Sequence, residues 1–222
     1  MKTIITVTGP SCAGKSTLEK KLRSLGVANM VSHTTREPRA GEVDGENYHF
    51  TDEVNFQRML LAGEFIEFVR FNDFSYGMSK RETFRQLENH DAIVVVVDPE
   101  GAMQMRKFCR ENGIYPLMVF VDAQDDVMAH RFLERFVGDM LTTYMRDKQK
   151  AFEVYSARLG TMFGTEQTWR RQAREMKLPY QVYFSKYDES NADTAANMIL
   201  SRVRDEIATP PSTTSKGEQH AA

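Results

Sequence analysis

The sequence predicts an α/β fold with a doubly wound parallel sheet. Four apolar runs of strand length alternate with segments of helical periodicity, which is typical of strand–helix–strand units with right-handed crossovers. The run Ile93-Val94-Val95-Val96-Val97 is continuously apolar, as expected of a parallel strand covered on both faces. The predicted strands are residues 4–8, 92–97, 116–121 and 181–184, and the predicted helices are residues 14–25, 79–89, 101–111, 125–136 and 195–206.

Two segments interrupt this alternation. Residues 32–78 are rich in glycine, arginine, glutamate and aromatic residues, and they predict a small mixed insertion over the carboxyl edge of the sheet. Within it we expect strands at 47–50 and 65–71 and a helix at 53–61, capped by Thr51 or Asp52. Residues 137–178 are polar with a helical pattern and predict a second, helical insertion.

The chain is therefore interpreted as one domain followed by a tail. The domain spans residues 1–207, with a core formed by 1–31, 79–136 and 179–207. Residues 208–222 lack apolar periodicity and are expected to be disordered.

Bulk composition narrows the classes of function. The net charge is −2 and the pI is near 6.2, which disfavours nucleic-acid binding because such proteins usually carry a basic excess. Two cysteines are too few for a disulfide framework and fit a reducing compartment. No apolar stretch approaches the ~20 residues of a membrane span. We expect a cytoplasmic protein without a membrane partner; the sequence does not predict its oligomeric state.

Residues 9–16 read GPSCAGKS and match G-x-x-x-x-G-K-[ST], the phosphate-binding loop or P-loop. The loop follows a predicted strand and opens a predicted helix, the context that distinguishes a P-loop from an ordinary glycine-rich turn. Its backbone N–H groups and the helix N-terminus favour an anion, so a P-loop NTPase-type sheet with bound ATP is expected. Lys15 would neutralise the β- and γ-phosphates during transfer, and the Ser16 hydroxyl would ligate Mg²⁺. The expected ATP-binding residues are Gly9, Ser11, Ala13, Gly14, Lys15, Ser16 and Thr17.

A second motif follows at residues 32–50, which read SHTTREPRAGEVDGENYHF. Together with the segments GEFIE at 63–67, YGM at 76–78 and VDPEG at 97–101, it resembles the guanylate kinase family, whose pattern after the P-loop is S-x-T-T-R-x-P-R-x-G-E-x-x-G-x-x-Y-x-F. The resemblance runs from residue 1 to about 120 and fades beyond 137.

Phosphate chemistry in this segment agrees with the resemblance. Arg36 and Arg39, three residues apart, can present two guanidinium groups to one phosphate, and the Tyr48 and Tyr76 hydroxyls can complete its shell. The alternative is that the two arginines are surface charges beside a proline turn.

For the base, the resemblance implies that Ser32, Glu67 and Asp98 hydrogen-bond guanine. Carboxylates only accept hydrogen bonds, and guanine offers the N1–H and amino donors that match them, whereas adenine lacks this pair of donors. Taken alone, Glu67 could instead be a solvent-facing strand residue.

The resemblance implies that residues 137–178 form a helical lid and that arginines in this part of the chain close over the transferring phosphoryl group. Arg131 and Arg135 are four apart and share one helix face, so we assign them a catalytic role; each could otherwise belong to a solvated helix face. A second arginine cluster could supply a further clamp: Arg158, Arg170, Arg171 and Arg174. The lone tryptophan of this stretch, Trp169, is interpreted as a packing residue.

Three positions depart from the family pattern. Met78 replaces a serine or threonine that reaches the base, Val96 replaces an aspartate near the metal, and Arg70 adds a charge beside the expected base pocket. The leading hypothesis is an ATP- and Mg²⁺-dependent kinase that converts GMP or dGMP into GDP or dGDP. The alternatives are a deoxynucleoside monophosphate kinase of broader or altered base choice, and a non-catalytic guanylate-kinase-like interaction module.

Overall fold

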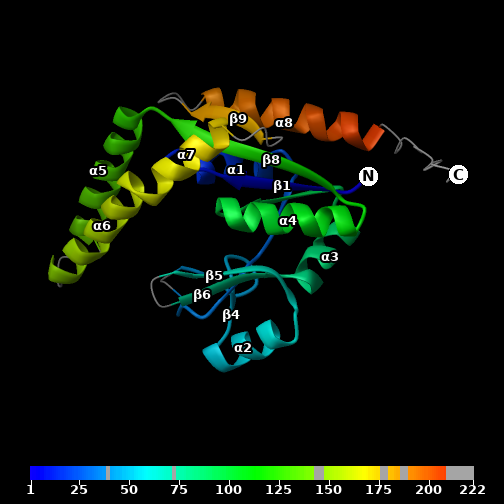
Figure 1. The fold of residues 1–222 in the computed structure, drawn as a ribbon, viewed down its shortest axis with the longest axis horizontal. Coiled ribbons are helices and arrows are strands. Elements are labelled where there is room, and N and C mark those ends of the chain that lie inside the picture. The colour runs from blue at the N-terminus through cyan, green and yellow to red at the C-terminus, as the bar shows by residue number, and fades with distance from the viewer. Residues whose placement is uncertain (39–40, 72–73, 143–147, 176–179, 186–189, 209–222) are drawn as a thin grey trace, which may run out of the picture.

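The computed structural model describes residues 1–38, 41–71, 74–142, 148–175, 180–185 and 190–208. Its central layer is a parallel sheet with the strand order β2-β7-β1-β8-β9 (Figure 1). The strands are β1 (Thr3–Thr8), β2 (Ala28–Asn29), β7 (Ala92–Val96), β8 (Tyr115–Ala123) and β9 (Tyr180–Ser185). This confirms the predicted α/β class and all four predicted core strands. The edge strand β2 was missed because its two residues are too short to show a pattern.

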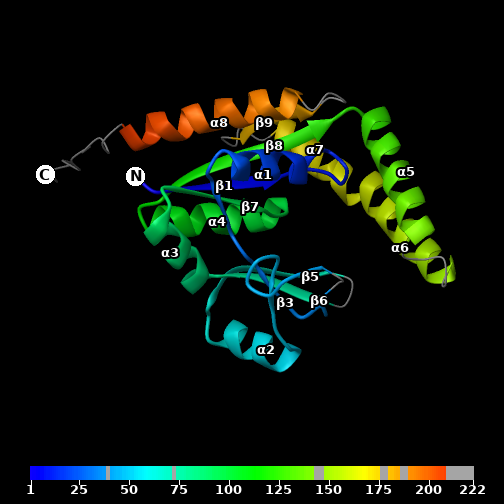
Figure 2. The same cartoon turned by 180° about the vertical axis from the view of Figure 1, so that it is seen from behind.

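Helices cover both faces of this sheet, as a doubly wound fold requires. They are α1 (Lys15–Ser24), α3 (Lys80–Asn89), α4 (Pro99–Glu111) and α8 (Ser190–Ala208). Alternate residues of β1 enter two separate hydrophobic clusters: Ile5 packs with Leu18 of α1, while Ile4 packs with Met105 of α4. Figures 1 and 2 show α4 and α8 on opposite sides of the sheet.

Side-chain caps fix where several helices begin. Asp98 follows β7 and caps α4, with its Oδ1 accepting a hydrogen bond of 2.7 Å from the N–H of Gly101. Asp52 caps α2 (Glu53–Leu61) in the same way through the N–H of Asn55, which settles the choice between Thr51 and Asp52.

The insertion forms a second sheet with the strand order β4-β3-β6-β5. Its strands are β3 (His33–Thr34), β4 (His49–Phe50), β5 (Phe65–Phe71) and β6 (Phe74–Ser79). The sequence predicted β4, β5 and α2 but missed β3 and β6. Gly77 breaks the alternation of apolar and polar side chains in β6. A Cβ at this position would lie 2.8 Å from the Phe65 ring, which stacks on Phe56, so the packing leaves no room for a side chain.

After β8 the chain forms a helical arm. The helices are α5 (Asp125–Thr142), α6 (Lys148–Phe163) and α7 (Thr165–Glu175). Figures 1 and 2 both show α5 and α6 side by side and projecting from the sheet, while α7 leads back to it. Tyr155 of α6 packs against Phe132 and Phe136 of α5.

The predicted tail falls almost wholly outside the described residues, which end at Ala208. Among the described helices, none combines the length and apolar character needed to cross a membrane.

Candidate active site

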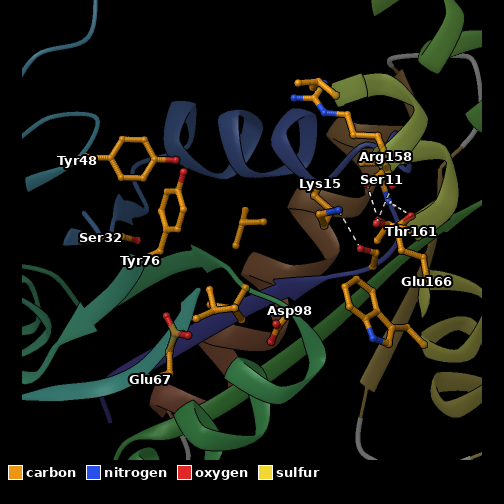
Figure 3. Close-up of a pocket in the computed structure, with 17 residues that line it drawn as sticks. Ser11, Lys15, Ser32, Tyr48, Glu67, Tyr76, Asp98, Arg158, Thr161 and Glu166 are labelled. Carbon is orange, nitrogen blue, oxygen red and sulfur yellow. Dashed lines mark hydrogen bonds between the residues drawn. The ribbon is translucent and has the colours of Figure 1, made fainter. Parts of the chain in front are cut away.

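A cleft of about 470 Å³ lies where the carboxyl edge of the main sheet, the inserted sheet and the arm meet. Eight of the residues predicted to bind ATP or GMP line it: Gly9, Ser11, Lys15, Ser32, Tyr48, Glu67, Tyr76 and Asp98. Figure 3 shows Ser32, Tyr48 and Tyr76 on one side, and Ser11, Lys15 and Glu166 on the other, with Asp98 between them. Segments far apart in the sequence thus contribute to one cavity.

The P-loop follows β1 and depends on unusual backbone conformations. Gly9 has φ of 145°, and a Cβ at this position would lie 2.0 Å from the carbonyl oxygen of Val121. Gly14 is left-handed at the N-cap of α1. Ala13 is buried, whereas Ser16 and Thr17 are exposed on the first turn of α1. The loop therefore has the curled shape that the motif predicts.

Lys15 folds back over this loop. Its Nζ donates hydrogen bonds of 2.8 Å to the carbonyl oxygens of Gly9 and Pro10. Burial lowers the pKa of the Lys15 ammonium group, and the nearby Glu166 carboxylate opposes that shift. A phosphate entering the loop would offer this ammonium group a stronger acceptor than the two carbonyls.

Across the cleft from the P-loop, Arg36, Tyr48 and Tyr76 lie close together. Arg36 donates from Nη2 to both carboxylate oxygens of Glu42, at 2.8 and 3.0 Å, and this pairing raises the pKa of its guanidinium group. Its Cζ lies 5.3 Å from the centre of the Tyr48 ring, which contacts Tyr76 edge-on. Arg39, the other expected phosphate ligand, lies outside the described residues.

Two acidic side chains lie deeper in the cleft. Glu67 of β5 is only 8% exposed, and Asp98 approaches it from the N-terminus of α4. Burial, with a smaller contribution from Asp98, raises the pKa of Glu67 to about 7. Among the described residues Glu67 has no hydrogen-bond or ion-pair partner, so its acceptor oxygens are available to a ligand.

The arm brings arginines to the donor side of the cleft. Arg131 of α5 donates to the carbonyl oxygen of Cys12 in the P-loop at 3.2 Å. Arg135, one turn later, is exposed. Burial is the main cause of the lowered pKa of Lys15, and the positive charge of Arg135 makes a smaller contribution in the same direction. Arg158 of α6 lines the cleft with its guanidinium carbon 5.0 Å from the centre of the Tyr155 ring.

Of the other arginines in the second cluster, Arg170 and Arg171 do not line the cleft. Arg170 is bound to Asp122 and Asp125 instead, and Arg171 is exposed. The side chain of Arg174 is not among those described.

The possible metal ligands in the cleft suit a metal ion that enters bound to a nucleotide. Within the described part of the chain, no group of three or more histidine, cysteine or acidic side chains could hold a metal ion. Ser16 presents an exposed hydroxyl beside Lys15 at the start of α1. Mg²⁺ commonly binds through substrate phosphates, water and one or two protein oxygens, so this chain's residues fit a metal carried by ATP phosphates with Ser16 as a ligand.

Comparison with known proteins agrees with this geometry. The family model described as guanylate kinase matches residues 1–162 of the 222. The chain belongs to the guanylate kinase family. A guanylate kinase from Aromatoleum aromaticum is 42% identical over 145 residues, covering 59% of this chain and 71% of that protein. Guanylate kinase from Caldanaerobacter subterraneus is 39% identical over 106 residues, covering 47% of this chain and 52% of that protein.

The similarity is concentrated in the N-terminal part. The chain spans about half the length of several of the curated guanylate kinases that it matches. A crystal structure of guanylate kinase from Anaplasma phagocytophilum shares the fold over 94% of this chain and 87% of its own, with a TM-score of 0.62 and 21% identity.

The three departures from the guanylate kinase pattern have different structural outcomes. Met78 is 1% exposed and packs in the core cluster beneath the cleft, where its sulfur accepts from the Ser32 hydroxyl at 3.7 Å. Val96 lines the cleft, so an apolar side chain stands where the family pattern has an aspartate. Arg70 is exposed and does not line the cleft: strand alternation turns it away from the face of Val69, which does. The expectation that Arg70 borders the base pocket is therefore wrong.

Glu166 and Trp169 are two of the cleft residues that were missed or misread in the sequence. Glu166, which is 3% exposed, accepts hydrogen bonds from both the N–H and the Oγ of Ser11. Nothing in the sequence signals this contact between residues 155 positions apart. Trp169, interpreted above as a packing residue, lines the cleft three residues later on α7. Aromatic identity alone does not tell packing from ligand contact.

Proposed function

We propose that this protein is an ATP-dependent nucleoside monophosphate kinase that transfers the γ-phosphoryl group of ATP to GMP or dGMP. The observation that carries the proposal is the single cleft, which has the P-loop at one end and Ser32, Tyr48, Tyr76, Glu67 and Asp98 at the other. Membership of the guanylate kinase family supports it.

Transfer in such a cleft needs positioning and charge neutralisation. The phosphate oxygen of the acceptor is already ionised, so the reaction requires neither a strong base nor a covalent intermediate. We assign the acceptor phosphate to Arg36, Arg39, Tyr48 and Tyr76. Lys15 would leave its two carbonyl partners to bind the transferring phosphoryl group, whose negative charge is spread over three equatorial oxygens in the transition state. When bound, Mg²⁺ supplies further neutralisation of the ATP phosphates.

The arm supplies the remaining positive charge. Arg131 is already bonded to the P-loop, and we add Arg158 to the candidates because it lines the cleft. We assign residues 32–78 to acceptor binding and residues 137–178 to the lid. Closure of the α5–α6 hairpin over the cleft would exclude water, which otherwise competes as acceptor.

Guanine recognition rests on the two acidic side chains. Glu67 and Asp98, as carboxylates, accept from the N1–H and amino groups of guanine. Adenine would place its N1 lone pair against them, and leaving such buried groups unpaired costs about 1–3 kcal/mol each. The proposed preference for GMP over AMP follows from this difference.

The test is a coupled assay of ADP formation with ATP and each of GMP, dGMP, AMP, CMP and TMP. We expect efficient turnover with GMP or dGMP and weak turnover with the other acceptors. Lys15→Ala should lower kcat at least 100-fold, whereas Lys20→Ala, an exposed lysine on the same helix, should not. Normal turnover by Lys15→Ala would contradict the assignment. Absence of turnover with every acceptor would favour a non-catalytic interaction module.

A second candidate function is a kinase with broader base choice, because of Met78. Its side chain lies in the core, and the Ser32 hydroxyl donates to its sulfur, so the base pocket has fewer polar groups than the family pattern provides. Comparable kcat/KM for several bases in the same panel would select this candidate. Met78→Ser should then increase the preference for guanine.

A further inference from the structure

Glu166 holds the P-loop at Ser11, inside the cleft. Ser11 is the third residue of the loop, and its N–H and hydroxyl both donate to the Glu166 carboxylate, at 2.8 and 2.5 Å (Figure 3). Hydrogen bonds to an ionised group are shorter and stronger than neutral ones. Both Ser11 donors are thereby fixed in direction by one side chain from α7.

The next residue of the loop is conformationally strained. Cys12 has φ of 60°, a left-handed conformation that non-glycine residues seldom adopt. Such a conformation persists only where the surroundings impose it. Glu166 holds the loop just before Cys12, and Arg131 binds the carbonyl oxygen of Cys12 itself. The two contacts thus hold the chain at Cys12 and at the residue before it.

The helix that carries Glu166 is itself anchored to the main sheet. Arg170, one turn later on α7, donates to Asp122 at 2.7 Å and to the carbonyl oxygen of Ala123 at 2.9 Å. It also pairs with Asp125 at the start of α5. Glu166 therefore lies in the part of the proposed lid segment that is anchored at the end of β8, whereas the α5–α6 hairpin projects away from the sheet (Figure 2).

We propose that Glu166 is a positioning residue for the nucleotide triphosphate, which acts through Ser11 to preorganise the P-loop. This inference rests on the proposed function, since it concerns the donor site of the same cleft. It predicts that Glu166 affects binding of ATP and leaves binding of the acceptor unchanged. It also predicts that hydrogen-bonding geometry matters more than the negative charge, which by itself repels phosphate.

Substitutions can separate geometry from charge. In Glu166→Gln the amide oxygen still accepts from the Ser11 N–H and the amide nitrogen donates to the Ser11 hydroxyl, so both contacts survive without the charge. Glu166→Ala removes both contacts. Ser11→Ala removes only the hydroxyl contact and tests the same link from the loop side. Thr168→Ala, on the exposed face of α7, is the matched control.

The experiment measures Kd by calorimetry for a non-hydrolysable ATP analogue with Mg²⁺ and, separately, for GMP. The emission of Trp169, the single tryptophan of the chain, gives a second readout from within the cleft. We expect Glu166→Ala, which removes both contacts, to weaken binding of the analogue about tenfold, and Ser11→Ala to weaken it less. Glu166→Gln and Thr168→Ala should stay within about threefold of the wild type, and GMP binding should not change.

The outcomes discriminate clearly. Unchanged analogue binding by Glu166→Ala, or equal weakening by the alanine and glutamine variants, overturns the inference. If Glu166→Ala does not fold, unchanged binding by Ser11→Ala overturns it, and selective weakening supports it. A wild-type protein that binds GMP but not the analogue overturns both the inference and the proposed function.

Discussion

The buried carboxyl group of Glu67 should make this protein less stable as the pH rises through neutrality. Burial, followed by the charge of Asp98, raises the pKa of Glu67 from its usual value near 4.5 to about 7 in the folded protein. Between these two values the folded state holds a proton that the unfolded chain releases, so the free energy of unfolding falls as pH increases. The difference of 2.5 pKa units corresponds to about 3 kcal/mol, fully present below pH 4.5 and lost above pH 7.

The assay is urea unfolding of the wild type and Glu67→Gln between pH 4.5 and 8. The amide of the variant does not titrate, so subtracting the two curves removes the contributions of groups that do not interact with Glu67. We expect the variant to gain about 3 kcal/mol relative to the wild type across this range. A difference between the two proteins that does not change with pH would refute the reasoning. A curve that rises with pH would mean that Glu67 is instead stabilised as a carboxylate.

Three further predictions concern stability and are checked by urea unfolding. Asp122→Ala should cost about 3 kcal/mol because it breaks a buried pair with Arg170, whose other contacts remain. Gly9→Ala should cost at least about 3 kcal/mol because the added Cβ would collide with a carbonyl oxygen of β8. Gly26 also has a positive φ, of 92°, but open space around it, so Gly26→Ala should cost less. Equal losses in the two variants would exclude the collision as the cause. Burial lowers the pKa of His33 to about 4 from 6.5, so stability should fall as pH drops through this interval, and His33→Gln should not show this loss.

Local patterns in the sequence were enough for the core of the fold and for much of the site. The β-branched run at 93–97 predicted a buried parallel strand, and the glycine spacing of 9–16 predicted the curled loop, because both depend on neighbours in the chain. The motif at 32–50 predicted that Arg36 and Tyr48 lie together, and they do. Their roles in binding stay predictions.

Contacts between distant segments were decided by the tertiary structure alone. The sequence contains no periodic or spacing signal that links Glu166 to Ser11, since their pairing depends on how α7 returns to the sheet after the α5–α6 hairpin. The same return withdraws Arg170 from the cleft and brings Trp169 into it. Chain packing also determines that Met78 turns into the core. Residue type and spacing specify which groups are available, and only the packing of elements decides which of them meet.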